Sequence, residues 1–503
     1  MLEYREVSPD ELRKAAAAIH NGGARPLTAM FANDERGLDG GMAIYCLFAD
    51  GDKAPFIGLK CRIAGEPWEY PSLAPDIPAA SWYEREINDL FGIVPAGHPD
   101  LRPLVLHENW PRGLYPLRKD FDPRQPVAEA ATDYPIPDVE GQGVFEVPVG
   151  PIHAGIIEPG HFRFSQAGEN IINLEAKLFF THRGIEKAVE GLPVADAFYR
   201  AERICGACTV SHALAFAQAV EGLAGAAVPA RAESVRVLAA ELERLYNHAG
   251  DIGNLCAGVG FAVGISHGAR LKERLMRLNE RVAGNRFLRG MVVPGGVAMD
   301  VTAALTQDIA GVLHELEGDL KGLLEILHEN NAFLDRVNTT GILSTRAAVD
   351  LGAVGVAARA SGVNADWRRD LPYSLYPKLD FKVPVYHSGD VAARLWVRAD
   401  EAFQAIGLIR QVLYGLPEVG GELRVRLPEL PAGASGAGWS ESARGGNLHW
   451  LMTGKNSTVY RLFVRSASYP NWPAVAVAAP GNIIPDFPLV NKSFELCYAC
   501  IDR

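Results

Sequence analysis

The sequence predicts an α+β protein, in which a small α/β N-terminal domain is followed by a mainly helical domain with peripheral strands. Three observations lead to this expectation. The chain has 503 residues, about twice what one ordinary hydrophobic core supports. Prolines recur between Asp122 and Pro151, which is typical of a linker or an extended strap. Long amphipathic segments of helical period dominate the chain after that stretch.

The N-terminal part of the chain, residues 1–125, mixes helical and strand patterns, as expected of a small α/β domain. Residues 126–150 are expected to link it to the second domain, residues 151–503. Within the first domain, helices are predicted at 11–19 and 82–91, and a strand at 42–48.

The second domain is expected to consist mainly of amphipathic helices. In one of them Leu238, Leu242 and Leu245 line one face, while charged residues lie between them. Strand patterns return after Leu423, for example at 458–465. The helical segments are predicted near 167–190, 209–224, 229–258, 264–285, 301–334 and 390–414.

The composition is that of a globular protein and excludes several functions. The chain is 48% hydrophobic and 22% charged, which are ordinary proportions. Its net charge of -11 argues against nucleic-acid binding, which requires a basic surface. No apolar run reaches the roughly 18 residues of a membrane span, and the N-terminus lacks the pattern of a secretory signal. We therefore expect a cytoplasmic subunit, peripheral on the inner face of the cell membrane through its partners.

The cysteines indicate a metal site. An odd number of them in a large chain without a secretory signal argues against a disulfide framework, so two Cys-x-x-Cys pairs are better explained as metal ligands. An iron–sulfur cluster normally takes four thiolates. If one site uses four, this chain holds no iron–sulfur cluster, and electrons must pass to another subunit. The pairs are Cys205 with Cys208 and Cys497 with Cys500; the isolated cysteines are Cys46, Cys61 and Cys256.

Spacing alone does not choose the metal. Zinc suits four thiolates, and a closed zinc site of that kind only stabilises a fold. Soft thiolates suit nickel and iron as well. Structural zinc sites usually gather their pairs within a few tens of residues, whereas these two pairs lie near opposite ends of the second domain, which counts against zinc.

The residues around both pairs resemble the large subunit of nickel–iron hydrogenases. That family has Arg-x-Cys-Gly-x-Cys-x-x-x-His near its beginning and Cys-x-x-Cys near its end; here they are Arg203 to His212 and Cys497 to Cys500. The branch it resembles is the energy-converting group typified by formate hydrogenlyase, which shares its fold with the 49-kDa subunit of respiratory complex I. Residues 84–121 resemble the complex I 30-kDa subunit, which this branch carries as a fused N-terminal domain. Further agreeing stretches are 158–163, 168–172, 182–187, 242–248, 359–362, 443–450 and 471–473.

The resemblance implies a site that contains nickel and iron. Cys205 and Cys497 would be terminal nickel ligands. Cys208 and Cys500 would bridge nickel to an iron that also carries small diatomic ligands. Such a site converts dihydrogen reversibly into protons and electrons, and Cys497 is the thiolate favoured to accept the proton first.

Three further residues have roles that the resemblance implies. Glu158 would exchange protons with the terminal thiolate; its alternative is a surface glutamate or an ion pair with Arg163. Arg444 would lie over the open metal position, and its alternative is an ion pair with Glu441. His212 would donate to a bridging sulfur, although a histidine early in a helix is more often a packing residue.

Some positions depart from the family pattern. Glu186 resembles a ligand of an auxiliary magnesium ion, but the residue at the end of the chain is Arg503 where histidine is usual. Arginine cannot ligate a cation, so magnesium and an arginine partner for Glu186 are both open. Glu495-Leu496 replaces the usual Asp-Pro, and Ala443 replaces a proline. The family is cleaved near this C-terminus after nickel insertion, so the sequence is expected to be the mature form or to need no cleavage.

The resemblance also implies partners: an iron–sulfur small subunit, antiporter-like membrane subunits and maturation factors for nickel insertion.

Two other functions stay open. One is a quinone-pocket module of the 49-kDa type without nickel, and the other is a non-catalytic scaffold holding structural zinc. The quinone-binding relatives lack the four cysteines, which favours the hydrogenase. A dinucleotide enzyme is not supported, because residues 258–264 miss the Gly-x-Gly-x-x-Gly spacing.

Overall fold

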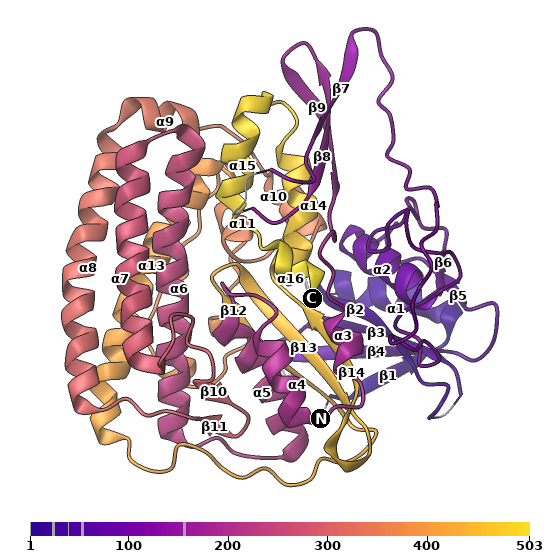
Figure 1. Ribbon diagram of the computed structural model, residues 1–503, viewed down its shortest axis with the longest axis horizontal. Coiled ribbons are helices and arrows are strands. Elements are labelled where there is room, and N and C mark those ends of the chain that lie inside the picture. Colours follow the sequence, from indigo (N-terminus) through magenta and orange to yellow (C-terminus); the bar gives the residue numbers. More distant parts are fainter. Residues whose placement is uncertain (1, 23–25, 39, 52–54, 154–156) are drawn as a thin grey trace.

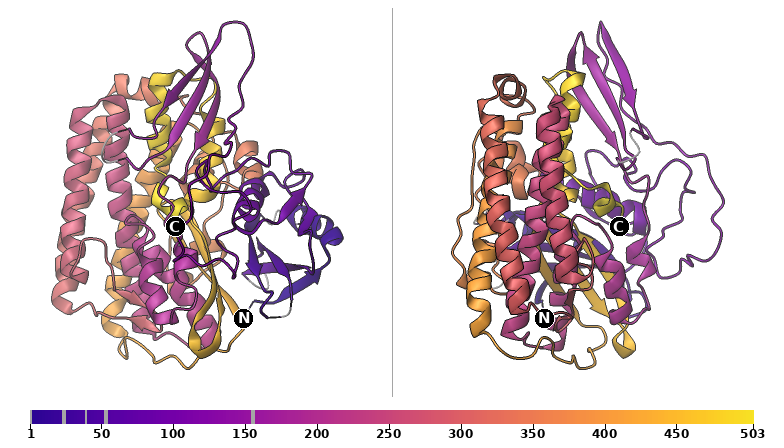
Figure 2. Two further views of the ribbon diagram at one scale, coloured as in Figure 1. Left: turned by 45° about the vertical axis from the view of Figure 1, so that its right-hand side comes forward. Right: turned by 60° about the vertical axis from the view of Figure 1, so that its left-hand side comes forward.

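The computed structural model describes the chain except for residues 1, 23–25, 39, 52–54 and 154–156. Figure 1 shows a small domain of sheet and helix packed against a larger body of long helices, with an arm of strands projecting beside them. The two views of Figure 2 show the same arrangement. This is the predicted α+β fold class.

The N-terminal domain is a mixed four-stranded sheet against which two helices pack. Its elements are β1 (Tyr4–Val7), α1 (Pro9–Asn21), β2 (Leu27–Asp34), β3 (Met42–Ala49), β4 (Phe56–Ile63), β5 (Glu69–Pro71), α2 (Ser81–Phe91) and β6 (Val94–Ala96). The sheet order is β1-β4-β3-β2, in which only β1 and β4 are parallel. The three elements predicted in this domain are confirmed as α1, β3 and α2.

The arm is a three-stranded antiparallel sheet built from β7 (Val144–Val149), β8 (His161–Ala167) and β9 (Asn170–Lys177). Residues 98–143 before it contain no helix or strand. The prediction of a helix across 167–190 is wrong, because only α3 (Ile185–Ala188) is helical there. Gly168, at φ +64, makes the turn from β8. Pairing with β8 and the β-branched Ile171 and Ile172 then favour a strand.

The helical body contains the remaining predicted helices, which are α5 (Thr209–Ala224), α6 (Ala230–Val259), α7 (Ala262–Ala283), α8 (Ala303–Glu329) with α9 (Asn331–Val337), and α13 (Val391–Gly415). It also contains four shorter helices that were not predicted: α4 (Val194–Glu202), α10 (Thr345–Asp350), α11 (Gly355–Ala360) and α12 (Trp367–Asp370). Helices α6, α7, α8 and α13 lie side by side as a bundle (Figures 1 and 2). The segment predicted at 301–334 is divided at Asn330, whose side chain accepts a hydrogen bond from Phe333 N and begins α9.

A central antiparallel sheet joins the helical body to the N-terminal domain. It contains β12 (Ser435–Ser442), β13 (Gly445–Thr453) and β14 (Val459–Arg465), and a short hairpin of β10 (Val292–Val293) and β11 (Gly296–Val297) lies apart from it. Helix α5 lies so close to β12 that a Cβ on Gly438 would be 2.1 Å from the Ala215 carbonyl oxygen. On the N-terminal domain, Phe31 stacks on Phe463 with ring centroids 4.3 Å apart. One hydrophobic cluster therefore contains residues of both domains, while the long helices of the helical body pack around a second cluster.

The C-terminal segment returns to the middle of the molecule. It forms α14 (Ser468–Ala478), α15 (Phe487–Phe494) and α16 (Tyr498–Asp502). The last residue, Arg503, is buried. Among the described helices, none has both the length and the apolar character that crossing a lipid bilayer requires.

Candidate metal centre

The two Cys-x-x-Cys pairs meet in one cluster. The Sγ atoms of Cys205, Cys208, Cys497 and Cys500 all lie within 4.8 Å of one another. All four are free thiols; three are buried, and Cys497 is partly exposed. The first pair lies in the loop between α4 and α5, and the second flanks the first turn of α16. The fold thus brings together the thiols predicted to share a metal.

Helix α6 holds the loop that carries the first pair. The Glu243 carboxylate accepts hydrogen bonds from Val210 N (2.6 Å) and Ser211 N (3.0 Å), at the start of α5. Burial raises the pKa of Glu243 to about 7. One turn further along α6, Tyr246 donates to the Gly206 carbonyl (3.0 Å) and Asn247 to the Ala207 carbonyl (2.7 Å). The stretch 242–248 therefore fixes the backbone between Cys205 and Cys208.

Arg183 links the two ligand segments directly. Its Nη2 donates to the Ile204 carbonyl (2.6 Å) and to the Ala499 carbonyl (2.9 Å). The Cys497 amide in turn donates to Ser468 Oγ at the start of α14 (3.0 Å). These backbone contacts set the spacing of the pairs without using the thiols themselves.

The thiol cluster favours a thiolate at Cys497. Hydrogen bonds from Cys205, Cys208 and Cys500 lower the pKa of Cys497, while the pKa values of Cys208 and Cys500 are raised. His212 Nε2 lies 3.7 Å from Cys500 Sγ. Burial lowers the pKa of His212 to about 4, so this histidine is neutral.

Glu158 lies beside the second pair. Its Oε2 accepts a hydrogen bond from Ala499 N at 2.7 Å, within the Cys-x-x-Cys turn. Partial burial, and secondarily the Cys497 thiolate, raise the pKa of Glu158. The alternative ion pair with Arg163 does not form, because Arg163 pairs with Glu146 (2.5 Å) and Asp138 on and beside the arm.

Arg444, in the turn between β12 and β13, is buried and pairs with Asp251 of α6. Both guanidinium nitrogens reach the carboxylate, and the Nη2–Oδ1 distance is 3.0 Å. Burial opposes its charge, but Asp251 raises the pKa of Arg444 above its ordinary value, so it stays protonated. The alternative pair with Glu441 is wrong: Glu441 pairs with Arg359 at 2.9 Å. Sequence reasoning missed Asp251, although it lies two turns after Glu243 on one helix face.

The substitution of Asp-Pro by Glu495-Leu496 has a local explanation. Glu495 ends α15 in the left-handed conformation, with φ +52. A proline at position 496 would push its predecessor to an extended conformation, so leucine is compatible with this turn. Glu495 accepts from Asn254 Nδ2 at 2.5 Å, and burial raises the pKa of Glu495 to about 7.

Glu186 has arginine partners rather than a metal site. It lies 2.7 Å from Arg461 and 3.3 Å from Arg503, and it accepts from Val464 N at 3.0 Å. Burial acts to raise the pKa of Glu186, but the two guanidinium groups lower it below its usual value. Magnesium needs about six oxygen ligands around it. Because the oxygens here already accept from guanidinium groups and an amide, they do not fit that ion.

We therefore expect magnesium to leave the stability of the protein unchanged. A cation that bound the native state would raise the unfolding temperature. Thermal unfolding in millimolar magnesium chloride and in chelator should give the same midpoint. A higher midpoint with magnesium, or one magnesium per chain after dialysis against chelator, would contradict the assignment of arginines to Glu186.

The four thiols fit a soft transition metal. Thiolates suit nickel, iron and zinc, whereas magnesium and calcium prefer oxygen. In the part of the chain that the structure describes, no other group of three or more histidine, cysteine or acidic ligand atoms converges closely enough to hold an ion. The fold and this site define a protein with a four-thiolate centre for a soft transition metal.

Comparison with known proteins agrees with this class. Residues 183–256 match the nickel-dependent hydrogenase family, residues 258–432 the 49 Kd subunit of respiratory-chain NADH dehydrogenase, and residues 5–127 its 30 Kd subunit. Formate hydrogenlyase subunit 5 of Escherichia coli (strain K12) is 36% identical over 95% of this chain and 84% of its own length. Hydrogenase-4 component G of the same organism is 34% identical, also over 95% of this chain and 84% of its own length.

A solved structure shares the fold. The membrane-bound sulfane sulfur reductase, an archaeal respiratory membrane complex, contains a chain that matches with a TM-score of 0.68 and 28% identity, over 72% of this chain and 99% of that one. The chain belongs to the large subunits of energy-converting nickel–iron hydrogenases that carry a fused 30-kDa-type domain. The family resemblance and the oxidoreductase class predicted from the sequence are confirmed.

Proposed function

We propose that this chain is the catalytic large subunit of a membrane-associated energy-converting hydrogenase, which interconverts H2 with two protons and two electrons. The observation that carries the proposal is the meeting of four thiols from distant parts of the sequence within 4.8 Å. The test is hydrogen evolution from a reduced dye by the chain produced anaerobically together with its iron–sulfur partner subunit and hydrogenase maturation factors. We expect turnover by the wild-type chain and none by Cys497→Ala; a wild-type chain that holds nickel and iron but is inactive would refute the proposal.

The four thiolates would hold two metals. Cys205 and Cys497 are assigned as terminal nickel ligands, and Cys208 and Cys500 as bridges to an iron with diatomic ligands. When bound, this pair would supply the polarisation that splits dihydrogen. The 3.7 Å separation of His212 Nε2 and Cys500 Sγ supports a role for His212 in tuning a bridging sulfur by hydrogen bonding.

Proton transfer is assigned to Cys497 and Glu158. The Cys497 thiolate accepts the proton that leaves dihydrogen, and Glu158 passes it to solvent. The Ala499 amide holds the Glu158 carboxylate beside the Cys-x-x-Cys turn. A raised pKa brings a carboxyl group closer to the range in which it both accepts and releases protons. The exposure of Glu158 lets the proton leave.

Arg444 is assigned to orient the substrate over the thiols. The two-point contact with Asp251 fixes the plane of the guanidinium group. A lysine ammonium group, with one contact, would not be fixed in this way. Because Asp251 keeps it protonated, Arg444 acts as a fixed positive charge and not as a base.

Electrons are proposed to leave through an iron–sulfur partner subunit. The remaining cysteines are buried apart from the site; Cys46 and Cys61 lie on neighbouring strands of the N-terminal sheet. A surface hollow next to the first ligand loop is lined by Arg183, Tyr199, Arg200 and Arg203. Tyr199 is 51% exposed there, and this face is the proposed docking site for the small subunit.

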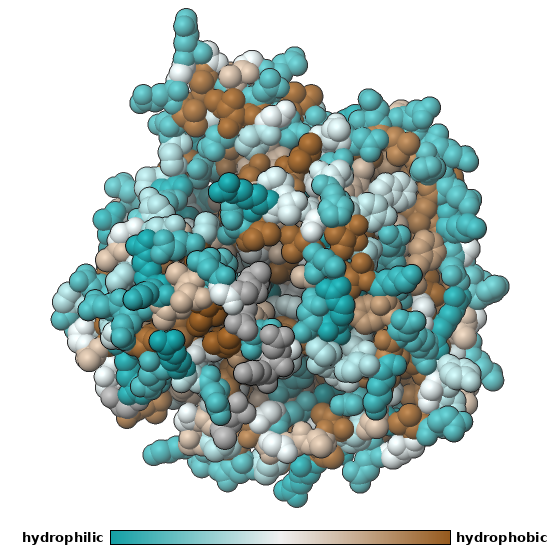
Figure 3. Space-filling model, turned by 180° about the vertical axis from the view of Figure 1, so that it is seen from behind, coloured by the Kyte–Doolittle hydropathy of each residue, from teal (hydrophilic) through white to brown (hydrophobic). Residues whose placement is uncertain are grey.

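Further partners are proposed to attach the complex to the inner face of the cell membrane. They are antiporter-like membrane subunits, with maturation factors acting during nickel insertion. Exposed apolar residues on the arm, such as Phe145 (48%) and Ile172 (39%), support a partner contact there; Figure 3 shows apolar side chains gathered on the arm. The relatives are subunits of multi-subunit complexes.

We also propose the domain division 1–125, 126–150 and 151–503. The end of the middle segment forms β7 of the arm, so the linker proper would be 126–143.

A quinone-pocket function is the second candidate, because an NADH-quinone oxidoreductase component of Bacteroides thetaiotaomicron is 29% identical over 89% of this chain and 88% of its own length. The thiol cluster favours the hydrogenase, and a structural zinc at the thiols would instead indicate a scaffold.

A further inference from the structure

The guanidinium group of Arg503 joins the end of the chain to the N-terminal domain. Arg503 is 3% exposed. It donates to Glu86 Oε2 of α2 and to the Val464 carbonyl of β14, and it lies 3.3 Å from Glu186 of α3. Its positive charge therefore touches three elements that are distant in the sequence, one of which belongs to the fused domain.

The charges at this point form a closed, buried set. Arg503 and Arg461 are the cations, and Glu86 and Glu186 are the anions. All four side chains are at most 7% exposed. Glu86 is the member that comes from the N-terminal domain. If Glu86 lost its charge, two buried guanidinium groups would share the single Glu186 carboxylate, and an uncompensated charge is costly in a protein interior.

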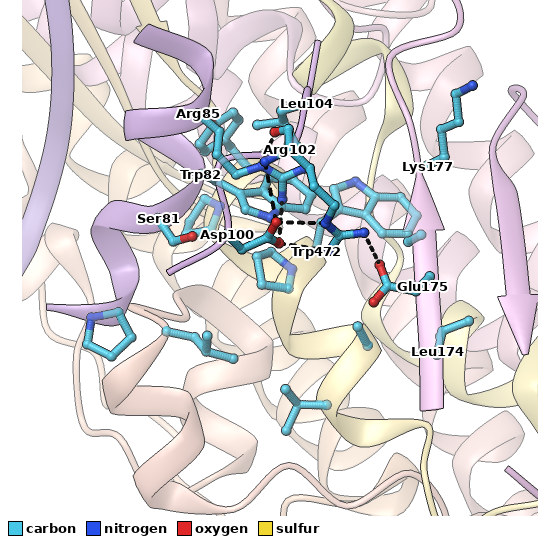
Figure 4. Close-up of a pocket in the computed structure, with 18 of the residues that line it drawn as sticks. Ser81, Trp82, Arg85, Asp100, Arg102, Leu104, Leu174, Glu175, Lys177 and Trp472 are labelled. Atoms are coloured by element: carbon cyan, nitrogen blue, oxygen red, sulfur yellow. Dashed lines mark hydrogen bonds and ion pairs between the residues drawn. The ribbon is translucent and has the colours of Figure 1, made fainter. Parts of the chain in front are cut away.

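Aromatic rings make a second connection along the same seam. Tyr469 of α14 packs on Tyr83 of α2 with centroids 4.9 Å apart, and the Arg503 guanidinium lies 5.2 Å from the Tyr469 ring. Trp472 of α14 contacts Tyr498 at 4.8 Å, and Tyr498 lies between the two C-terminal cysteines. Figure 4 shows the neighbouring pocket of about 340 Å³, where α2, β9 and α14 meet.

The segment that carries Cys497 and Cys500 needs such support. Helix α16 has five residues, too few for a helix that is stable on its own. Ser468 and Arg183 hold its beginning. Arg503 follows Cys500 by one helical turn and holds its end. Asp502 is also held there, by Thr181, His182 and the Arg183 amide, so release of Arg503 would remove one of two anchors at the end of this turn and would weaken the hold on Cys500.

We propose that Glu86 of the fused N-terminal domain is a positioning residue, which acts through Arg503 to hold Cys497 and Cys500 in the metal cluster. The N-terminal domain is thus part of the closure of the site and not only an attachment module. This role goes beyond the proposed catalytic function, and it holds for any metal that the thiols bind.

The test compares Glu86→Gln with wild type in the full, metal-free chain. The first readout is the rate at which iodoacetamide alkylates each cysteine, followed by mass spectrometry. We expect labelling at Cys497 and Cys500 to be about tenfold faster in Glu86→Gln, because the local opening of α16 becomes easier. Labelling at Cys46 and Cys256, which are buried elsewhere, should not change.

The second readout is cobalt(II) binding, followed by its thiolate charge-transfer absorption. Glu86→Gln should bind cobalt about tenfold more weakly or worse, while Arg503→Lys, which keeps the charge, should fall between it and wild type. Glu190→Gln is the matched control: it removes an ion pair between the domains, with Lys119 at 2.6 Å, and should behave like wild type.

Wild-type labelling rates and cobalt affinity in Glu86→Gln would overturn the proposal, and so would an equal effect of Glu190→Gln. If Glu86→Gln does not fold, Glu86→Asp provides the same test with a shorter carboxylate, and faster labelling at the two C-terminal cysteines supports the proposal. If the wild-type chain binds no cobalt, the four-thiol metal site fails, whereas the labelling rates still decide the role of Glu86.

Discussion

Glu158→Gln is expected to lower hydrogen turnover about 10²- to 10³-fold without loss of bound metal. Glutamine retains the size of the side chain and its hydrogen bond from Ala499 N, but it cannot accept and release a proton. Removal of a positioned acid–base group typically costs a factor of this order. The measurement is hydrogen evolution from a reduced dye, together with the metal content of the same preparation.

Glu169→Gln is the control for that experiment. Glu169 is an exposed acid in the turn between β8 and β9 and has no contact with the thiols, so its loss should leave turnover unchanged. Turnover of Glu158→Gln at the wild-type rate would show that protons leave Cys497 by another route.

Arg444→Lys should lower hydrogen turnover by a similar factor, about 10²-fold or more, again with the metal retained. Lysine keeps the positive charge but offers a single ammonium group, which cannot reproduce the two-point contact with Asp251. The charge would then no longer be fixed in the position that its proposed role requires. Loss of one preorganised electrostatic contact at a reacting site typically has an effect of this size.

The matched control is Arg368→Lys. Arg368 is equally buried and makes an equivalent two-point contact with Asp366 (2.7 and 3.0 Å), but it lies outside the thiol site. Both substitutions should reduce thermal stability to a similar extent, whereas only Arg444→Lys should reduce turnover. Equal turnover of the two variants would assign Arg444 to the core rather than to the reaction.

The sequence predicts elements well where the pattern is local. The long helices α6, α7 and α13 were predictable because their apolar residues recur at helical spacing over many turns. Strand β9 was not, because residues 170–177 form a strand through pairing with β8 across a glycine turn. The central sheet's contact with Phe31 likewise depends on residues hundreds of positions apart.

The candidate site shows the same division. The sequence predicts which four cysteines share a metal, because two Cys-x-x-Cys motifs are a recognisable pattern of metal ligands. The partners of the charged residues could not. Both alternatives named for Arg444 and Glu158 joined residues close in sequence, whereas Asp251 and Ala499 are brought to them only by folding. Similarly, the sequence shows that Arg503 stands where histidine is usual in the family, but the contact of Arg503 with Glu86 depends on how the two domains pack.

The most direct measurement is the nickel and iron content of protein produced anaerobically with hydrogenase maturation factors, with Cys497→Ala alongside. About one nickel and one iron per chain, with the nickel lost in the variant, is the result that a site of four thiolates predicts. Zinc at one per chain, or a well-folded protein without metal, would contradict the hydrogenase assignment and favour the scaffold or the quinone module.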